Sequence, residues 1–236
     1  MDAPVKLMPQ RDPFRILVSA VLSTRTQDPV TAAASARLFR VASDPHALGR
    51  LGPARIQKLI FPVGFYRTKA KLLPQLARLL VECWDGKVPR TMAELLELPG
   101  VGRKVASIVL SQGYGLPAIA VDTHVQRVSN RLDLVRTSRP IDTESELMEI
   151  LPRRVWKDWN HLIVALGQTI CRPRQPLCSV CPLSRLCPKR GVAPASDANR
   201  KLTTKTQRHK KNPTSELRTP AVRPGHSGFW SLTSGF

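Results

Sequence analysis

Residues 98–104, near the middle of the chain, restrict its possible structures more than any other stretch: they read Leu-Pro-Gly-Val-Gly-Arg-Lys. The proline has no backbone N–H, and the two glycines favour backbone angles that other residues avoid, so a helix cannot run through this segment. Residues 91–94 before it have the pattern of a capping box, and residues 104–111 after it are mostly apolar. The sequence therefore predicts two helices joined by a tight turn, a helix–hairpin–helix.

The turn also predicts an anion-binding site. Gly100, Val101 and Gly102 come directly before the second helix, and the two glycines have no side chains that would cover its first N–H groups. Exposed amides at a helix N-terminus attract negative charge and commonly bind phosphate. We therefore expect these three residues to contact a phosphate group of an anionic partner.

Lys104 lies in the first turn of the second predicted helix. There the helix dipole opposes a positive side chain, and the neighbouring Val105 and Ile108 indicate partial desolvation. Both effects favour a neutral amine, which is a nucleophile capable of forming a Schiff base. The alternative is that Lys104 is one phosphate-contacting cation among 37 lysines and arginines, and the motif by itself does not decide between the two.

Asp122 has two possible roles as well. It precedes a predicted helix with Val125, Val128 and Leu132 on one face, so it can act as the N-cap. However, the hairpin lysine and this aspartate are paired across a hydrophobic connector, residues 118–121. Packing of the two helices can then bring Asp122 and Lys104 to the two walls of one cleft, as a carboxylate and an amine.

Helix starts are marked elsewhere in the chain, and we find no alternating pattern typical of strands. Proline follows a residue suited to the N-cap at three positions, namely 28–29, 44–45 and 52–53. Residues 143–146 read Thr-Glu-Ser-Glu, a second capping box, which predicts that a helix begins there and runs to Leu151. The sequence thus predicts an all-α protein.

Four cysteines form a compact set near the end of the apolar part of the chain: Cys171, Cys178, Cys181 and Cys187. Since no secretory signal is apparent, such a set is more typical of a metal site than of disulfides. Four thiolates can hold either a zinc ion or a [4Fe–4S] cluster. Their spacing alone leaves both possibilities open.

The charge of the chain predicts a polyanionic partner. The net charge is +20 and the pI is about 10.9, which indicates nucleic acid. No stretch reaches the roughly 18 apolar residues of a membrane-spanning helix, so we expect no membrane partner and a cytoplasmic, nucleoid-associated location. Residues 191–236 carry eight basic and two acidic residues without apolar periodicity, and we expect a basic, disordered tail.

The hairpin sequence LPGVGRK followed by AVDTHVQRV resembles the helix-hairpin-helix DNA glycosylase superfamily, and within it the endonuclease III family of base-excision repair enzymes. The resemblance extends from about residue 12 to residue 190. It implies an all-α, two-lobed fold with a C-terminal iron–sulfur cluster loop. Its parts would be a short N-terminal segment (1–13), a six-helix lobe containing the hairpin (14–135), a C-terminal helical lobe with the four cysteines (136–190) and the tail.

The resemblance also implies an activity. In that family the lysine matching Lys104 attacks the sugar C1′ and the aspartate matching Asp122 assists, whereas adenine-specific relatives carry serine and thymine-mismatch relatives tyrosine at the lysine position. A lysine therefore implies a bifunctional glycosylase and AP lyase that removes oxidised or damaged pyrimidines and nicks the strand by β-elimination. The alternatives are a monofunctional glycosylase of the mismatch or uracil type and a noncatalytic DNA-binding module.

Three further residues receive roles from the resemblance. Arg25 matches a position, usually glutamine, on a loop that fills the gap left by an extruded base, and Phe65 matches an apolar wedge, often leucine. His124 is expected to contact DNA or to lie at a hinge. The four cysteines are expected to hold a [4Fe–4S] cluster, with zinc as the alternative. The implied partner is double-stranded DNA with a damaged base or an abasic site, bound by a monomer.

Overall fold

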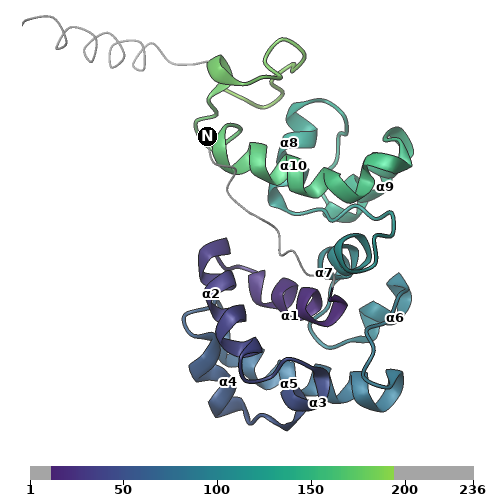
Figure 1. The fold of residues 1–236 in the computed structure, drawn as a ribbon. Coiled ribbons are helices and arrows are strands. Elements are labelled where there is room, and N and C mark those ends of the chain that lie inside the picture. The colour runs from purple at the N-terminus through teal and green to yellow at the C-terminus, as the bar shows by residue number, and fades with distance from the viewer. Residues whose placement is uncertain (1–11, 194–236) are drawn as a thin grey trace, which may run out of the picture. The chain divides into compact units, whose positions relative to one another are not determined.

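The computed structural model describes residues 12–193. The expectations for the tail and for the N-terminal segment concern residues that lie almost entirely outside this range. Every regular element between residues 12 and 193 is a helix, which confirms the predicted all-α fold (Figure 1). In this part of the chain no helix has the length and apolar character needed to cross a membrane.

The elements follow one another with short connections. In chain order they are α1 (Pro13–Ser23), α2 (Asp28–Phe39), α3 (Pro45–Arg50), α4 (Pro53–Ile60), α5 (Tyr66–Trp84), α6 (Met92–Glu97), α7 (Arg103–Ile108), the π-helical turn η1 (Val109–Gly113), α8 (Thr123–Arg131), α9 (Pro140–Ile150), the 3-10 turn η2 (Arg153–Val155), α10 (Trp156–Thr169) and the 3-10 turn η3 (Cys178–Val180).

Several helix starts follow the local rules. Asp44 caps α3 by accepting the N–H of Ala47 at 2.8 Å, and proline occupies the first turn of α1, α2, α3 and α4. At α6 the predicted capping box is present, since the Thr91 Oγ1 accepts the N–H of Glu94 at 3.3 Å and donates to its carboxylate at 2.6 Å.

The first hydrophobic core is built around α1. Leu17, Val18 and Leu22 are completely buried because other helices surround this one: α1 packs against α2, α5, α7 and η1. The mostly apolar sequence of α1 follows from this position, as a helix surrounded by others needs little polar surface. The core extends through α3, α4 and α6 to Ala118.

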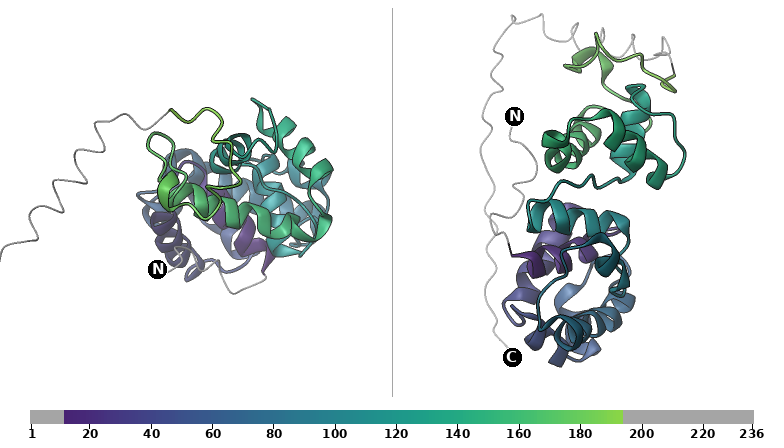
Figure 2. Two further views of the ribbon diagram at one scale, coloured as in Figure 1. Left: turned by 90° about the horizontal axis from the view of Figure 1, so that it is seen from above. Right: turned by 90° about the vertical axis from the view of Figure 1, so that its right-hand side faces the viewer.

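A second core begins at Ile119 and joins α8, α9 and α10 (Figures 1 and 2). Val125 and Val128 of α8 pack there with Leu147 and Ile163. The change of core therefore falls between residues 118 and 119, ahead of the lobe boundary expected after residue 135, because α8 packs against α10. The segment 118–121 thus leads from one core into the other.

The second predicted capping box is wrong. Helix α9 begins at Pro140, with Arg139 as an N-cap that makes no side-chain cap hydrogen bond. Thr143 lies inside the helix, and its hydroxyl donates to the Arg139 carbonyl at 3.1 Å. The helix thus begins one turn earlier than predicted, because proline is suited to the first helical position.

Candidate active site

The hairpin has the geometry that its glycines predict. Gly100 has a φ of +78°, and a Cβ there would lie 2.6 Å and 2.8 Å from the two methyl carbons of Leu72. Gly102 is different: it is the N-cap of α7 in an extended conformation, and nothing lies within 4 Å of the position of a Cβ. Gly100 is thus needed for the turn, and Gly102 leaves the start of α7 uncovered.

This difference predicts opposite results for two substitutions. Gly100→Ala should lower the free energy of unfolding by about 1–3 kcal/mol, since alanine is strained at positive φ and must displace Leu72. Gly102→Ser should leave it unchanged or slightly higher, because serine is a favourable N-cap. Urea unfolding of both variants measures the difference, and equal destabilisation would contradict the assignment.

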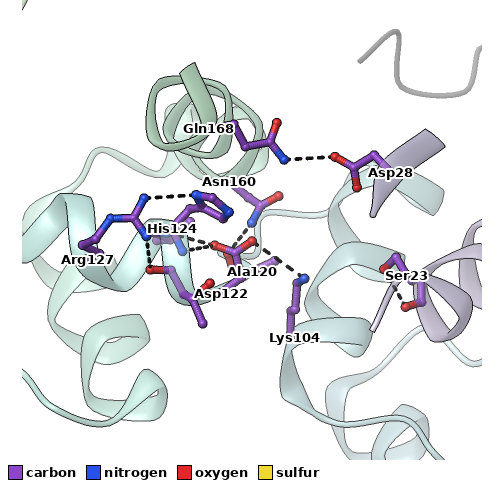
Figure 3. Close-up of polar contacts among 12 residues, drawn as sticks. Ser23, Asp28, Lys104, Ala120, Asp122, His124, Arg127, Asn160 and Gln168 are labelled. Carbon is purple, nitrogen blue, oxygen red and sulfur yellow. Dashed lines mark hydrogen bonds and ion pairs between the residues drawn. The ribbon is translucent and has the colours of Figure 1, made fainter. Parts of the chain in front are cut away.

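Lys104 and Asp122 lie side by side. The lysine is in the first turn of α7 and the aspartate directly precedes α8, and Lys104 Nζ is 3.8 Å from Asp122 Oδ2 (Figure 3). The side chains are 36% and 14% exposed, so the aspartate is largely buried and the amine is reachable from solvent. The pairing expected from the sequence is therefore present, although 18 residues separate the two positions.

The two oxygens of Asp122 have different tasks. Oδ1 accepts the N–H groups of His124 and Val125, both at 2.9 Å, so Asp122 is the N-cap of α8. Oδ2 faces Lys104. The sequence offered the helix cap and the carboxylate beside the amine as alternative roles. Asp122 has both, because the cap through Oδ1 fixes the direction of Oδ2.

Two further contacts hold this pair, and sequence analysis missed both. Asn160 of α10 donates to the Ala120 carbonyl at 2.8 Å, two residues before Asp122 (Figure 3). Arg103 binds Glu144 of α9 through two hydrogen bonds of 2.9 Å and 3.0 Å, and this contact raises the pKa of Arg103. The partners are about 40 residues apart, so no local pattern in the sequence indicates them.

His124 lies in the first turn of α8 beside α10. Its Nδ1 is 3.1 Å from Nη2 of Arg127, and a Cβ on Gly167 would come within 2.8 Å of the same ring nitrogen. Arg127 also donates to the carbonyls of Gly167 and Cys171, and desolvation by burial lowers its pKa. His124 is therefore part of the contact between α8 and α10, and its role toward DNA stays a prediction.

Arg25 and Phe65 meet each other at the surface. Both side chains are exposed, and the Arg25 guanidinium carbon lies 5.6 Å from the centre of the Phe65 ring. The two residues come from the α1–α2 and α4–α5 connections. The structure thus brings together the two side chains to which the resemblance gives the roles of gap filler and wedge.

The four cysteines of the predicted cluster line one pocket. Cys171, Cys178, Cys181 and Cys187 surround it together with Arg131 and other residues, and all four are free thiols. Arg131 Nη1 lies 3.4 Å from the Cys171 sulfur, and the Lys189 N–H donates to the Cys187 sulfur at 3.3 Å. Between residues 12 and 193 no group of three or more His, Cys, Asp or Glu side chains is arranged to hold a metal ion.

Comparisons with known proteins identify the family to which the chain belongs. A family model described as HhH-GPD superfamily base excision DNA repair protein matches residues 18–153. Endonuclease III of Thermotoga maritima is 47% identical over 178 residues, which are 75% of this chain and 84% of that protein.

Solved structures show the same relation. A trapped endonuclease III–DNA covalent intermediate has a TM-score of 0.74 and 38% identity, with 80% of this chain and 88% of that chain covered. A thermostable thymine-DNA glycosylase has a TM-score of 0.69 and 27% identity, with 77% and 85% covered. The chain therefore belongs to the HhH-GPD superfamily of base excision DNA repair proteins and, within it, to the endonuclease III family.

Proposed function

We propose that this protein is a bifunctional DNA glycosylase and AP lyase of base-excision repair, which removes oxidised or damaged pyrimidines from duplex DNA and cuts the strand. The observation that carries the proposal is the Lys104 amine, 3.8 Å from a carboxylate oxygen of Asp122 that is not used by the helix cap. The similarity to an endonuclease III trapped covalently on DNA supports it.

In the first step the bond between the base and the sugar breaks. Positive charge develops on the sugar, and the carboxylate of Asp122 stabilises it. The ammonium form of Lys104 must lose a proton before it can attack, and Oδ2 of Asp122 is the acceptor at hand. The amine then bonds to C1′ while the bonding electron pair leaves with the base, which takes up a proton.

In the second step the strand is cut. Opening of the sugar ring leaves a Schiff base between Lys104 and C1′, which acidifies the proton on C2′. Removal of that proton and expulsion of the 3′ phosphate oxygen complete a β-elimination, and water then releases the lysine. No step consumes or delivers an electron, so the residues of the pocket lined by cysteines are assigned to structure and DNA binding.

Strand nicking at a single abasic site tests this function. The proposed enzyme nicks such a duplex without heat or alkali. A monofunctional glycosylase leaves the abasic strand intact, and a noncatalytic binding module binds the duplex without changing it. Absence of nicking by the purified chain would overturn the lyase part of the proposal.

The cysteine pocket is suited to a [4Fe–4S] cluster. Four cysteines line it, and the N–H groups of Arg131 and Lys189 point to two of their sulfurs, as N–H groups do around the sulfurs of iron–sulfur clusters. Such a cluster would fix the loop in place.

This assignment predicts that the purified protein is brown and contains iron and inorganic sulfide in equal amounts. Cys181→Ser should remove both and lower the thermal unfolding temperature, because the loop loses its cross-link. The exposed Cys83, outside the pocket, is the matched control: Cys83→Ser should keep both. Stoichiometric zinc without iron would establish the alternative metal.

The partner in this proposal is double-stranded DNA with a damaged base or an abasic site. The net charge of +20 supports it, since neutralising phosphates releases counterions and strengthens binding at low salt. We further infer that a monomer acts on the DNA and that it does so in the cytoplasm at the nucleoid.

A further inference from the structure

The strongest unexplained feature outside the active site is the paired tip formed by Arg25 and Phe65. Both residues have left-handed backbone conformations, with φ of 52° and 56°. Such conformations cost a residue other than glycine about 1 kcal/mol or more and persist only where the surroundings fix them. Contacts with neighbouring residues must therefore fix the paired tip in this conformation.

The first of these contacts joins the two loops directly. The Gly64 N–H donates to Thr26 Oγ1 at 3.1 Å. A Cβ on Gly64 would lie 2.2 Å from the carbonyl oxygen of Arg25, so only glycine allows the two backbones to approach this closely. Gly64, directly before Phe65, is thus held against both Arg25 and Thr26.

Lys69 supplies the second contact. It lies in the first turn of α5, is only 6% exposed, and donates to the carbonyls of Leu22 at 2.9 Å and Thr24 at 2.7 Å. These carbonyls end α1, where a cation is also favoured by the helix dipole. Burial lowers the pKa of Lys69 to about 8, which shows that a lysine is kept here at an energetic cost.

The contacts form one continuous network. Thr26 Oγ1 accepts from Gly64 and donates to the Thr24 carbonyl at 3.2 Å, and Lys69 donates to the same carbonyl. Lys69 thus ties the start of the helix that follows Phe65 to the end of the helix that precedes Arg25. Both hydrogen bonds of Lys69 go to the end of α1, and neither reaches Lys104 or Asp122.

We propose that Lys69, Thr26 and Gly64 form a clamp that fixes Arg25 and Phe65 as one preformed unit for entering the base stack of a duplex, with Lys69 as a positioning residue. This inference rests on the proposed function, since that reaction requires a base to leave the helix. Unstacking a base costs a few kcal/mol. A side-chain pair that is already ordered loses little conformational entropy on binding. More of the binding free energy is therefore available to open the duplex.

Unstacking can be followed with a duplex that contains a tetrahydrofuran abasic analogue next to 2-aminopurine, whose fluorescence rises when it leaves the stack. The full-length protein should raise the signal, and Lys69→Met should reduce the affinity measured by it about tenfold, the equivalent of ordering two side chains on binding. Lys71→Met is the control, because this exposed lysine is on the same helix and its loss changes the charge equally. Equal behaviour of the two variants would overturn the proposal.

A second pair of variants, at Thr26, tests the clamp even if Lys69→Met does not fold. Thr26→Val is nearly isosteric and removes the acceptor for Gly64, whereas Thr26→Ser keeps it. We expect Thr26→Val to lose duplex opening and Thr26→Ser to retain it, with similar unfolding temperatures. Loss in neither, or the same loss in both, would refute a role of the hydroxyl in the clamp.

The chemistry gives an independent readout. On a single-stranded abasic oligonucleotide, which needs no opening, borohydride should trap Lys69→Met on DNA as efficiently as the unchanged protein. Reduced trapping there would mean that Lys69 acts on the reaction and not on the paired tip. If the unchanged protein forms no trapped adduct on any abasic substrate, the proposed function fails, while the fluorescence comparison still tests the clamp.

Discussion

Replacing Lys104 by alanine is expected to abolish the covalent adduct that borohydride traps between the protein and abasic DNA. Only a primary amine can form the Schiff base that borohydride reduces, and Lys104 is the amine placed beside Asp122. Loss of a nucleophile lowers rates by on the order of a thousandfold or more, so strand nicking should fall to background. Gel electrophoresis of the reduced mixture measures both quantities.

The control separates chemistry from charge. Lys87→Ala also removes one lysine, but this side chain is 80% exposed, lies in the connection between α5 and α6 and pairs with Asp85. It should trap and nick like the unchanged protein. The Lys104→Ala protein should remain folded, because a partly exposed ion pair contributes less than about 1 kcal/mol. An adduct that survives Lys104→Ala would show that another amine is the nucleophile.

Asp122→Asn is expected to lower the rate of base removal by on the order of a hundredfold to a thousandfold. The change removes the negative charge that faces Lys104 and the developing positive charge of the sugar. It keeps the cap of α8, because asparagine is as good an N-cap as aspartate. The rate of base release from a duplex with a single 5-hydroxyuracil measures the effect.

Two comparisons make this result specific. Asp122→Ala should lose the same activity and in addition about 1 kcal/mol of stability, because both backbone N–H groups at the start of α8 lose their acceptor. Trapping of Asp122→Asn at a preformed abasic site should be less affected than base removal, since no glycosidic bond remains to be broken. Base removal at the normal rate would show that Asp122 only caps the helix.

Helix α8 connects these functional elements. Its N-terminus carries Asp122, and farther along Arg127 and Arg131 donate to the main chain of the cysteine loop at residues 171–173. One helix therefore links the cysteine loop to Asp122, the carboxylate that we propose for the reaction.

Local features were predictable from the sequence because they depend on neighbouring residues. Proline and glycine fix the hairpin at residues 98–104, short polar side chains cap α3, α6 and α8, and the residue types at positions 104 and 122 define the available chemistry. Lys69 left a signal too, as it shares the apolar face of α5 with Leu73, Leu76 and Leu80, where a lysine is out of place.

Tertiary structure alone decided which distant residues meet. The Arg103–Glu144 contact, the change of core at Ile119 and the contact between Arg25 and Phe65 all join segments that are far apart in the chain. The amino-acid sequence by itself thus determined the helices, the turn and the two reactive groups. The tertiary structure determined that these groups face each other, because the ion pair joins the first turn of α7 to the N-cap of α8 and local backbone preferences do not specify how two helices are placed.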